Sequence, residues 1–251
     1  MKPTIIRRTR ADKLFDTLNV ILMAIVLVIT LYPLYFVLIA SVSDAYEVAK
    51  GNVFLWPKGF TAESYLNVFK ENRVWLGYRN TLFYTLTGTF FSLILTIPSA
   101  YALSKKTLPG RRLINVFFLI PMYFNGGLIP TYLVMKKIGV VNQWYSLILI
   151  AASSVYNMIV TRAYFQSNVP EELYESARID GANELKTFFR IALPLVKPIL
   201  AVMTLFFAVA RWNDYFNAMI YLSNSDLFPL QLVLRNILIQ NQMAAAAIDP
   251  T

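Results

Sequence analysis

Long apolar runs separated by short charged links are the main pattern along this chain. Four runs contain no charged residue, and they occupy positions 20–40, 81–103, 113–135 and 141–161. A helix that crosses a bilayer needs roughly 20 mostly apolar residues. A fifth apolar stretch at 195–222 carries Lys197, Arg211 and Asp214. We therefore expect an all-α integral membrane bundle in one domain, residues 1–251, with spans at about 14–43, 78–104, 113–136, 141–165 and 195–222.

The composition agrees with a membrane protein and removes several kinds of chemistry. Of the 251 residues, 57% are hydrophobic and 15% are charged, whereas soluble domains carry about 25% charged residues. The chain has no cysteine and no histidine. Disulfides, thiolate nucleophiles, Cys/His zinc sites and Ser-His triads are thereby excluded. Any catalysis would have to rest on carboxylates, Lys or Tyr. We expect no catalytic residue, no metal site and no cofactor bound by this chain.

The net charge of +9 is explained by basic residues beside the spans. Loops rich in Lys and Arg stay on the cytoplasmic side of a membrane. The two most basic segments are the N-terminal tail and the link between the second and third spans, which holds Lys105, Lys106, Arg111 and Arg112 without an acid. The sequence therefore predicts a cytoplasmic N-terminus, residues 44–73 outside and residues 162–193 inside. No basic run has the interleaved aromatics of a nucleic-acid site.

The segment 168–198, NVPEELYESARIDGANELKTFFRIALPLVKP, is too polar to span the membrane. It predicts two short helices: Asn168 can cap the first, and Pro170 suits its first turn. Asp180-Gly181 can end that helix, because glycine tolerates a left-handed conformation. The second helix is expected at about 182–192. The residues alone leave two interpretations open, which are a packed interfacial hairpin and a docking element for a cytoplasmic partner.

This segment resembles the EAA motif of binding-protein-dependent import permeases. The resemblance is carried by Glu175-Ser176-Ala177, then Gly181, Ile191 and Leu193-Pro194. Ser176 departs from the alanine that many members have. The longer run from Glu175 to Ala182 is similar to the carbohydrate-uptake class. Residues 126–132 and 229–235 are similar to permeases for oligosaccharides and polysaccharide fragments.

The resemblance implies a multi-pass subunit of an ABC importer in the bacterial cytoplasmic (inner) membrane. The partners it implies are a second permease, a dimer of ATP-binding subunits, an extracellular or periplasmic solute-binding protein and an oligosaccharide cargo. The chain has no G-x-x-x-x-G-K-[ST] loop. We therefore expect a partner to bind ATP-Mg and this chain to be a transport subunit, not an enzyme. The family has six spans, and we expect that the sixth is missing by truncation.

The same resemblance makes the segment 167–193 a cytoplasmic coupling segment whose first helix enters a cleft of the ATPase. We expect Leu173, Tyr174 and Ala177 to offer the apolar surface for that cleft. Glu175 and Asp180 should offer charge at its rim, and Gly181 should make a sharp turn. The predicted coupling residues are Leu173, Tyr174, Glu175, Ser176, Ala177, Asp180, Gly181 and Ala182. The resemblance also predicts that residues 223–251 face the solute-binding protein. A helix that lies on the membrane surface is the other interpretation of this segment.

A possible cargo pathway lies on the fifth span. Aromatic faces and amides are the groups that a sugar site needs, and the stretch offers Trp212, Asn213, Asp214, Tyr215 and Asn217. An aromatic belt at the membrane interface is the other interpretation.

Rival functions make different demands on the charged residues of the spans. Arg211 and Asp214 are three apart, so a structural ion pair is favoured over an intramembrane catalytic pair. Spans one to four lack the acidic residues expected of an ion-coupled transporter. A permease for another small solute and a non-transporting assembly protein remain as alternatives.

Overall fold

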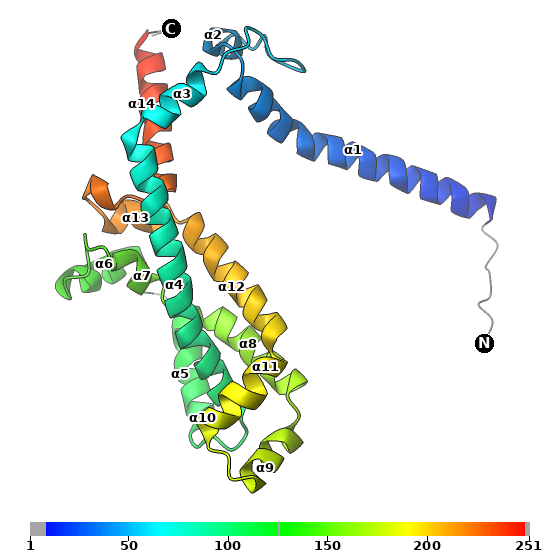
Figure 1. Cartoon of the computed structure of the whole chain (residues 1–251), viewed down its shortest axis with the longest axis vertical. Coiled ribbons are helices and arrows are strands. Elements are labelled where there is room, and N and C mark those ends of the chain that lie inside the picture. The colour runs from blue at the N-terminus through cyan, green and yellow to red at the C-terminus, as the bar shows by residue number, and fades with distance from the viewer. Residues whose placement is uncertain (1–8, 125, 249–251) are drawn as a thin grey trace. The chain divides into compact units, whose positions relative to one another are not determined.

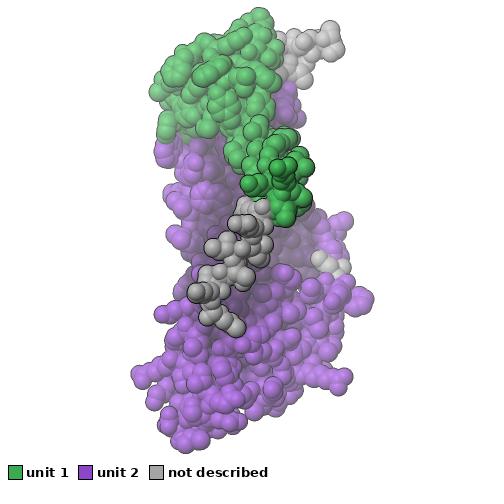
Figure 2. Space-filling model, turned by 90° about the vertical axis from the view of Figure 1, so that its right-hand side faces the viewer, with its two compact units in different colours: residues 1–71 green, residues 72–251 purple. Residues whose placement is uncertain are grey.

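The computed structural model describes residues 9–124 and 126–248, and the side chains of residues up to 243 apart from 125. Within these ranges the regular structure is helical without strands, which confirms the all-α prediction. The basic tail at residues 1–8 and the end of the predicted receptor-facing stretch, residues 249–251, lie outside the described residues. The chain falls into two compact units, residues 1–71 and 72–251 (Figure 2).

The first unit is built on one long apolar helix. Its helices are α1 (Arg10–Ser41), α2 (Ala45–Ala49) and α3 (Glu63–Lys70). Thr9 caps α1 through a reciprocal pair of hydrogen bonds with Asp12. The hydroxyls of Tyr32 and Tyr35 donate to the carbonyls of Phe54 and Leu55, which holds the following loop against α1. Other residues of this chain leave most apolar side chains of α1 uncovered, as expected for a surface that lipid or another subunit covers.

The second unit is arranged along one helix of 33 residues, α4 (Asn72–Ser104). The other elements are α5 (Arg111–Tyr123), α6 (Leu128–Lys137), α7 (Ser146–Ile150), α8 (Val155–Asn168), α9 (Glu171–Ile179), α10 (Glu184–Thr187), the π-helix η1 (Phe188–Ala192), α11 (Leu193–Leu195), α12 (Lys197–Trp212), α13 (Phe216–Tyr221), the 3₁₀ turn η2 (Ser225–Leu227) and α14 (Leu230–Ile248). Helix α4 packs mainly against α12, α8 and α14.

The largest apolar core lies where α4, α8 and α12 meet. Ala100, Phe165, Ala192, Val196 and Met203 are almost completely buried there. Small residues on α4 allow close approach of its neighbours, as is common between membrane helices. This core fixes one end of α4 against the chain on both sides of the predicted coupling segment.

The other end of α4 holds the start of α14. The Asn80 amide donates to the carbonyls of Asp226 and Phe228 at 2.7 and 3.1 Å. The Tyr84 hydroxyl donates to the Leu227 carbonyl at 2.9 Å. Thus α9 and α10 lie at one end of α4, whereas α14 lies at the other (Figure 1).

The predicted spans differ in how continuous they are. Helices α1 and α4 are each long and apolar enough to cross a membrane, and two bent pairs would raise the number to four among the described residues. These pairs are α5 with α6, and α10–α11 with α12, the latter bent by 83°. The bend at Val196 lies between Pro194 and Pro198, and each proline lacks the N–H that a continuous helix would use.

The predicted fourth span, 141–165, is not one helix. Helix α7 ends at Ile150 and α8 begins at Val155. The Ser154 hydroxyl accepts from the Asn157 N–H and so caps α8, which starts a new helix instead of continuing α7. The apolar run therefore contains a break that its composition did not reveal.

Candidate functional site

The predicted coupling segment forms a short helix, a tight turn and a second helical stretch. Helix α9 begins after Pro170 and ends at Ile179, with Asp180 as its C-cap. Gly181 follows with φ of +71°, which confirms the predicted left-handed turn. Asn183 caps α10 by accepting from the Lys186 N–H at 2.8 Å. The prediction that Asn168 caps α9 is wrong, because its amide donates back to Tyr164 within α8.

The two faces of α9 have different surroundings. Tyr174 and Ala177 are only 8% and 3% exposed, and the Tyr174 ring packs against Tyr101 of α4 within the apolar core. The prediction that these two side chains fill a cleft of a partner is therefore wrong. Ile179 is 86% exposed, and Leu173, Leu185 and Phe189 are also exposed apolar side chains. The outward surface also includes predicted coupling residues that are exposed or partly exposed: Glu175, Ser176, Asp180, Gly181 and Ala182.

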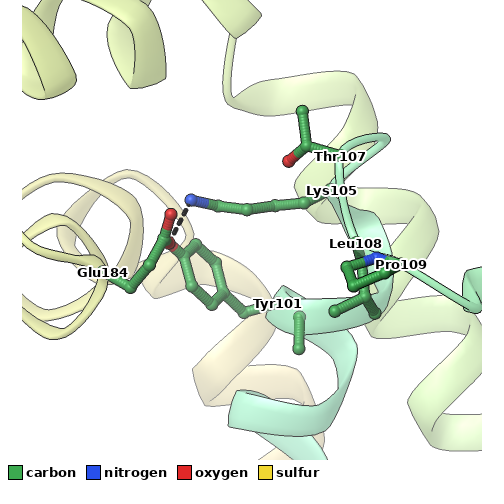
Figure 3. A pocket seen from close by; sticks show the side chains of 7 residues that line it. Tyr101, Lys105, Thr107, Leu108, Pro109 and Glu184 are labelled. Atoms are coloured by element: carbon green, nitrogen blue, oxygen red, sulfur yellow. Dashed lines mark hydrogen bonds and ion pairs between the residues drawn. The ribbon is translucent and has the colours of Figure 1, made fainter.

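Lys105 joins this segment to the end of α4. Its amino group pairs with the carboxylate of Glu184 on α10. It lies 4.8 Å from the ring centroid of Tyr101 on α4 and 4.4 Å from that of Tyr174 on α9. The Tyr101 hydroxyl donates to the same carboxylate at 3.1 Å. Figure 3 shows Lys105 extended toward Glu184 beside the Tyr101 ring. These three side chains line a cavity of about 290 Å³.

Lys105, Tyr101, Tyr174 and Glu184 together form what we call the Lys105 cluster. Their surroundings shift the pKa values of Glu184 and Tyr174. The hydrogen bond from Lys105 lowers the pKa of the Glu184 carboxyl, and its positive charge adds to this effect. Burial raises the pKa of Tyr174 to about 12. A cation over an aromatic ring is worth about 0.5–2 kcal/mol depending on desolvation. Sequence reasoning used Lys105 only as a topological charge and missed Tyr101 and Glu184, because nothing local connects residues some eighty positions apart.

Arg211 is a buried cation inside the fifth predicted span. Its guanidinium donates to the carbonyls of Leu147, Ile148 and Ala151, and to the Ser92 hydroxyl at 3.1 Å. The predicted ion pair with Asp214 is not formed, because the guanidinium donors are directed at backbone oxygens around α7. A Cβ on Gly88 would lie 2.8 Å from the Arg211 Cζ, so glycine leaves the room that this side chain needs.

A cavity of about 340 Å³ opens beside Arg211. Asp214 and Asn217 line it, and the Asn217 amide donates to the Asp214 carboxylate at 2.9 Å. The remaining lining residues come from α12, from the break between α7 and α8 and from the first turn of α8: Ala151, Ser153, Ser154, Asn157, Phe206, Phe207 and Ala210. The cavity is therefore lined by hydroxyl, amide and aromatic side chains, which are the groups that bind a saccharide.

Three of the predicted pathway residues do not line this cavity. Asn213 donates its amide to the Val209 carbonyl at 2.9 Å. The Tyr215 ring lies 5.7 Å from the Arg235 guanidinium, and the Trp212 ring packs near Tyr78. Sequence reasoning missed Asn157, Ser153 and Ser154. Their signal was the small polar group within the otherwise apolar run 141–161.

Known proteins match most of the length of this chain. A family described as binding-protein-dependent transport system inner membrane component matches residues 74–248. The chain belongs to this family. Protein LplC of Bacillus subtilis (strain 168) is 39% identical to this permease over 241 residues, covering 96% of this chain and 81% of LplC.

Two further relatives have names that state a cargo. The polygalacturonan/rhamnogalacturonan transport system permease protein YtcP of the same organism is 37% identical over 228 residues, covering 91% of this permease and 79% of YtcP. A crystal structure of a bacterial ABC transporter involved in the import of the acidic polysaccharide alginate superposes with a TM-score of 0.89. It is 36% identical, and 96% of this permease and 87% of that chain are covered.

Proposed function

We propose that this permease is a multi-pass subunit of an ABC importer in the bacterial cytoplasmic membrane, and that it carries oligosaccharides or polysaccharide fragments into the cell. The observation that carries the proposal is the exposed outer face of α9 and α10, which is anchored from inside to the end of α4. A docking surface must be free on one side and rigidly held on the other. The cargo class is supported by the YtcP and alginate relatives.

The division of labour follows from the family and from the residues. An ATPase dimer binds the outer face of α9, a second permease completes the pathway, and a solute-binding protein delivers cargo at the opposite end of α4, where residues 223–251 begin. In this arrangement Glu175, Asp180 and the exposed Leu173 and Ile179 contact the ATPase. Tyr174 and Ala177 hold the coupling helix on its inner face. ATP binding then shifts the permease between two states by its different contacts in each.

The cavity beside Arg211 is the proposed cargo contact. Asn217 and Asn157 offer amides, Ser153 and Ser154 offer hydroxyls, and Phe206 offers an aromatic face. Because Arg211 is occupied by carbonyls, its role is to shape the wall and not to bind cargo.

Two neighbouring amides provide a matched test in the purified complex with its ATPase and binding protein. Asn217→Ala removes an amide that lines the cavity, whereas Asn213→Ala removes one that bonds within its own helix. A panel of oligogalacturonides, arabinooligosaccharides and maltodextrins is assayed by stimulated ATP hydrolysis and uptake. We expect the half-saturating concentration to rise about tenfold for Asn217→Ala, as for roughly 1.4 kcal/mol of lost binding, with a smaller change for Asn213→Ala.

Equal effects of the two variants would remove the cargo role from the cavity. ATP binding by the isolated permease, or failure of an ATPase to copurify with it, would contradict the proposed function itself.

A further inference from the structure

The Lys105 cluster joins the end of α4 to α9 and α10, the two helices on either side of the Gly181 turn. Lys105 follows directly after α4, and its side chain is 10% exposed. It touches Tyr101 on α4, Tyr174 on α9 and Glu184 on α10. One cation thus connects a long helix with both helices of the coupling segment.

The contacts restrict sliding in a way that apolar packing alone does not. The Lys105 amino group is placed over two rings and paired with a carboxylate, and each of these contacts has a preferred direction. The Tyr101 ring also lies 6.1 Å from the Tyr174 ring and 4.9 Å from the Phe188 ring. Moving α9 or α10 past the end of α4 would separate the buried Lys105 ammonium group from its carboxylate or its rings. A buried charge without a partner costs free energy.

The other end of α4 makes a rigid link useful. Lys105 is 25 residues from Asn80, so the two lie about 38 Å apart along a helix with 1.5 Å rise per residue. Asn80 binds the backbone before α14. A displacement that enters at α9 therefore reaches the Asn80 end directly if α4 moves with the coupling segment.

We propose that Lys105 is a positioning residue for coupling: it locks α9 and α10 to the end of α4, so that they move as one body when the ATPase closes. The inference rests on the proposed function, because it requires the ATPase to bind α9. It assigns Lys105, Tyr101, Tyr174 and Glu184 a role in transmitting motion, separate from the exposed residues that contact the ATPase.

Spin labels can test this by a distance measurement that needs no known cargo. The chain contains no cysteine, so introduced cysteines are its only labelling sites. Cysteines at the exposed positions Leu86 on α4 and Lys186 on α10 are labelled in the assembled complex, and ATPase copurification is checked first. The distance between labels is measured without nucleotide and after trapping with ATP and vanadate. We expect one narrow distribution in both states for the native sequence.

Lys105→Met keeps an apolar side chain of similar length between the rings and removes the charge. We expect its distance distribution to broaden or shift after ATP–vanadate trapping, and uptake per ATP hydrolysed to fall by about fivefold or more. Lys105→Arg keeps the charge and should restore both values. Lys106→Met removes the neighbouring exposed charge and should behave as the native chain does.

A second variant covers failure of Lys105→Met to assemble. Glu184 has a side chain that is 65% exposed, so Glu184→Gln should fold and should broaden the distribution in the same way. If the ATPase copurifies but neither variant changes the distances, this inference is overturned and the proposed function stands. If the ATPase does not copurify with the native chain, the proposed function is what fails.

Discussion

At the scale of single residues, Arg211 shows how a buried cation can be held mainly by backbone carbonyls. The last carbonyls of a helix have no partner within it, and they carry the negative end of the helix dipole. Leu147 and Ile148 belong to α7, and Ala151 follows directly after it. Arg211 satisfies these oxygens together, so it joins α12 to the broken region between α7 and α8.

Gly88 is predicted to be required because of this cation. An added Cβ would lie 2.8 Å from the Arg211 Cζ and 2.9 Å from its Nε, so the guanidinium would have to leave its carbonyl partners. We expect Gly88→Ala to lower the free energy of unfolding by about 1–3 kcal/mol, as overpacking commonly does. The check is the thermal unfolding of the purified permease in detergent.

Gly126→Ala is the control for this substitution. Its added Cβ would meet the Pro130 Cβ at 3.8 Å, which is ordinary contact. If both variants melt at the same temperature, Gly88 is not needed for the placement of Arg211.

Arg211 also shows what the sequence could not provide. The spacing of three from Asp214 suggested an ion pair, because residues three apart share a helix face. The actual partners are backbone oxygens from a segment some sixty positions earlier. Carbonyls have no identity in a sequence, so a pattern of side chains cannot reveal them.

At the scale of elements, the sequence predicted where helices occur and that the chain turns at Gly181. It did not predict which face of α9 is buried or where the fourth apolar run breaks. The polar segment and its glycine were found because turn chemistry is local. The inward placement of Tyr174 was missed because both faces of α9 carry apolar side chains, and periodicity does not say which one meets the core. The break at Ser154 was missed because a hydroxyl can either cap a helix or bond within one.

The turn between α9 and α10 gives a sharp prediction. Gly181 has φ of +71° and Gly139 has φ of +74°, and an added Cβ would find nothing within 4 Å at either position. Valine at either site therefore has a similar backbone cost, roughly 1–2 kcal/mol for a left-handed conformation. We expect Gly181→Val to leave membrane insertion intact but to reduce ATPase association and uptake together, because the strain tilts α9.

Gly139→Val controls for that strain in the turn after α6. It should insert equally well and keep most of the uptake activity. If Gly181→Val shows near-native ATPase association and uptake, the segment is only an interfacial hairpin and its coupling role is lost.

At the scale of the whole chain, the length of α4 separates the proposed ATPase-binding surface from the proposed receptor-facing end. Asn80 and Lys105 lie about 38 Å apart along the helix, which exceeds the roughly 30 Å hydrocarbon thickness of a bilayer. The end with the coupling segment carries Lys105, Lys106, Arg111 and Arg112. The positive-inside rule therefore assigns that end to the cytoplasm and the Asn80 end to the outside.

This sidedness can be measured by labelling single introduced cysteines with a membrane-impermeant maleimide in intact cells. Lys58, Lys106 and Ser225 are all exposed, and the chain has no cysteine of its own. We expect cysteine at Lys58 or Ser225 to react from outside, and cysteine at Lys106 to react only after permeabilisation. Labelling of the Lys58 and Lys106 sites from the same side would contradict the topology. Reaction at the Lys106 site from outside would also place the coupling segment away from ATP, so the ATPase could not bind α9.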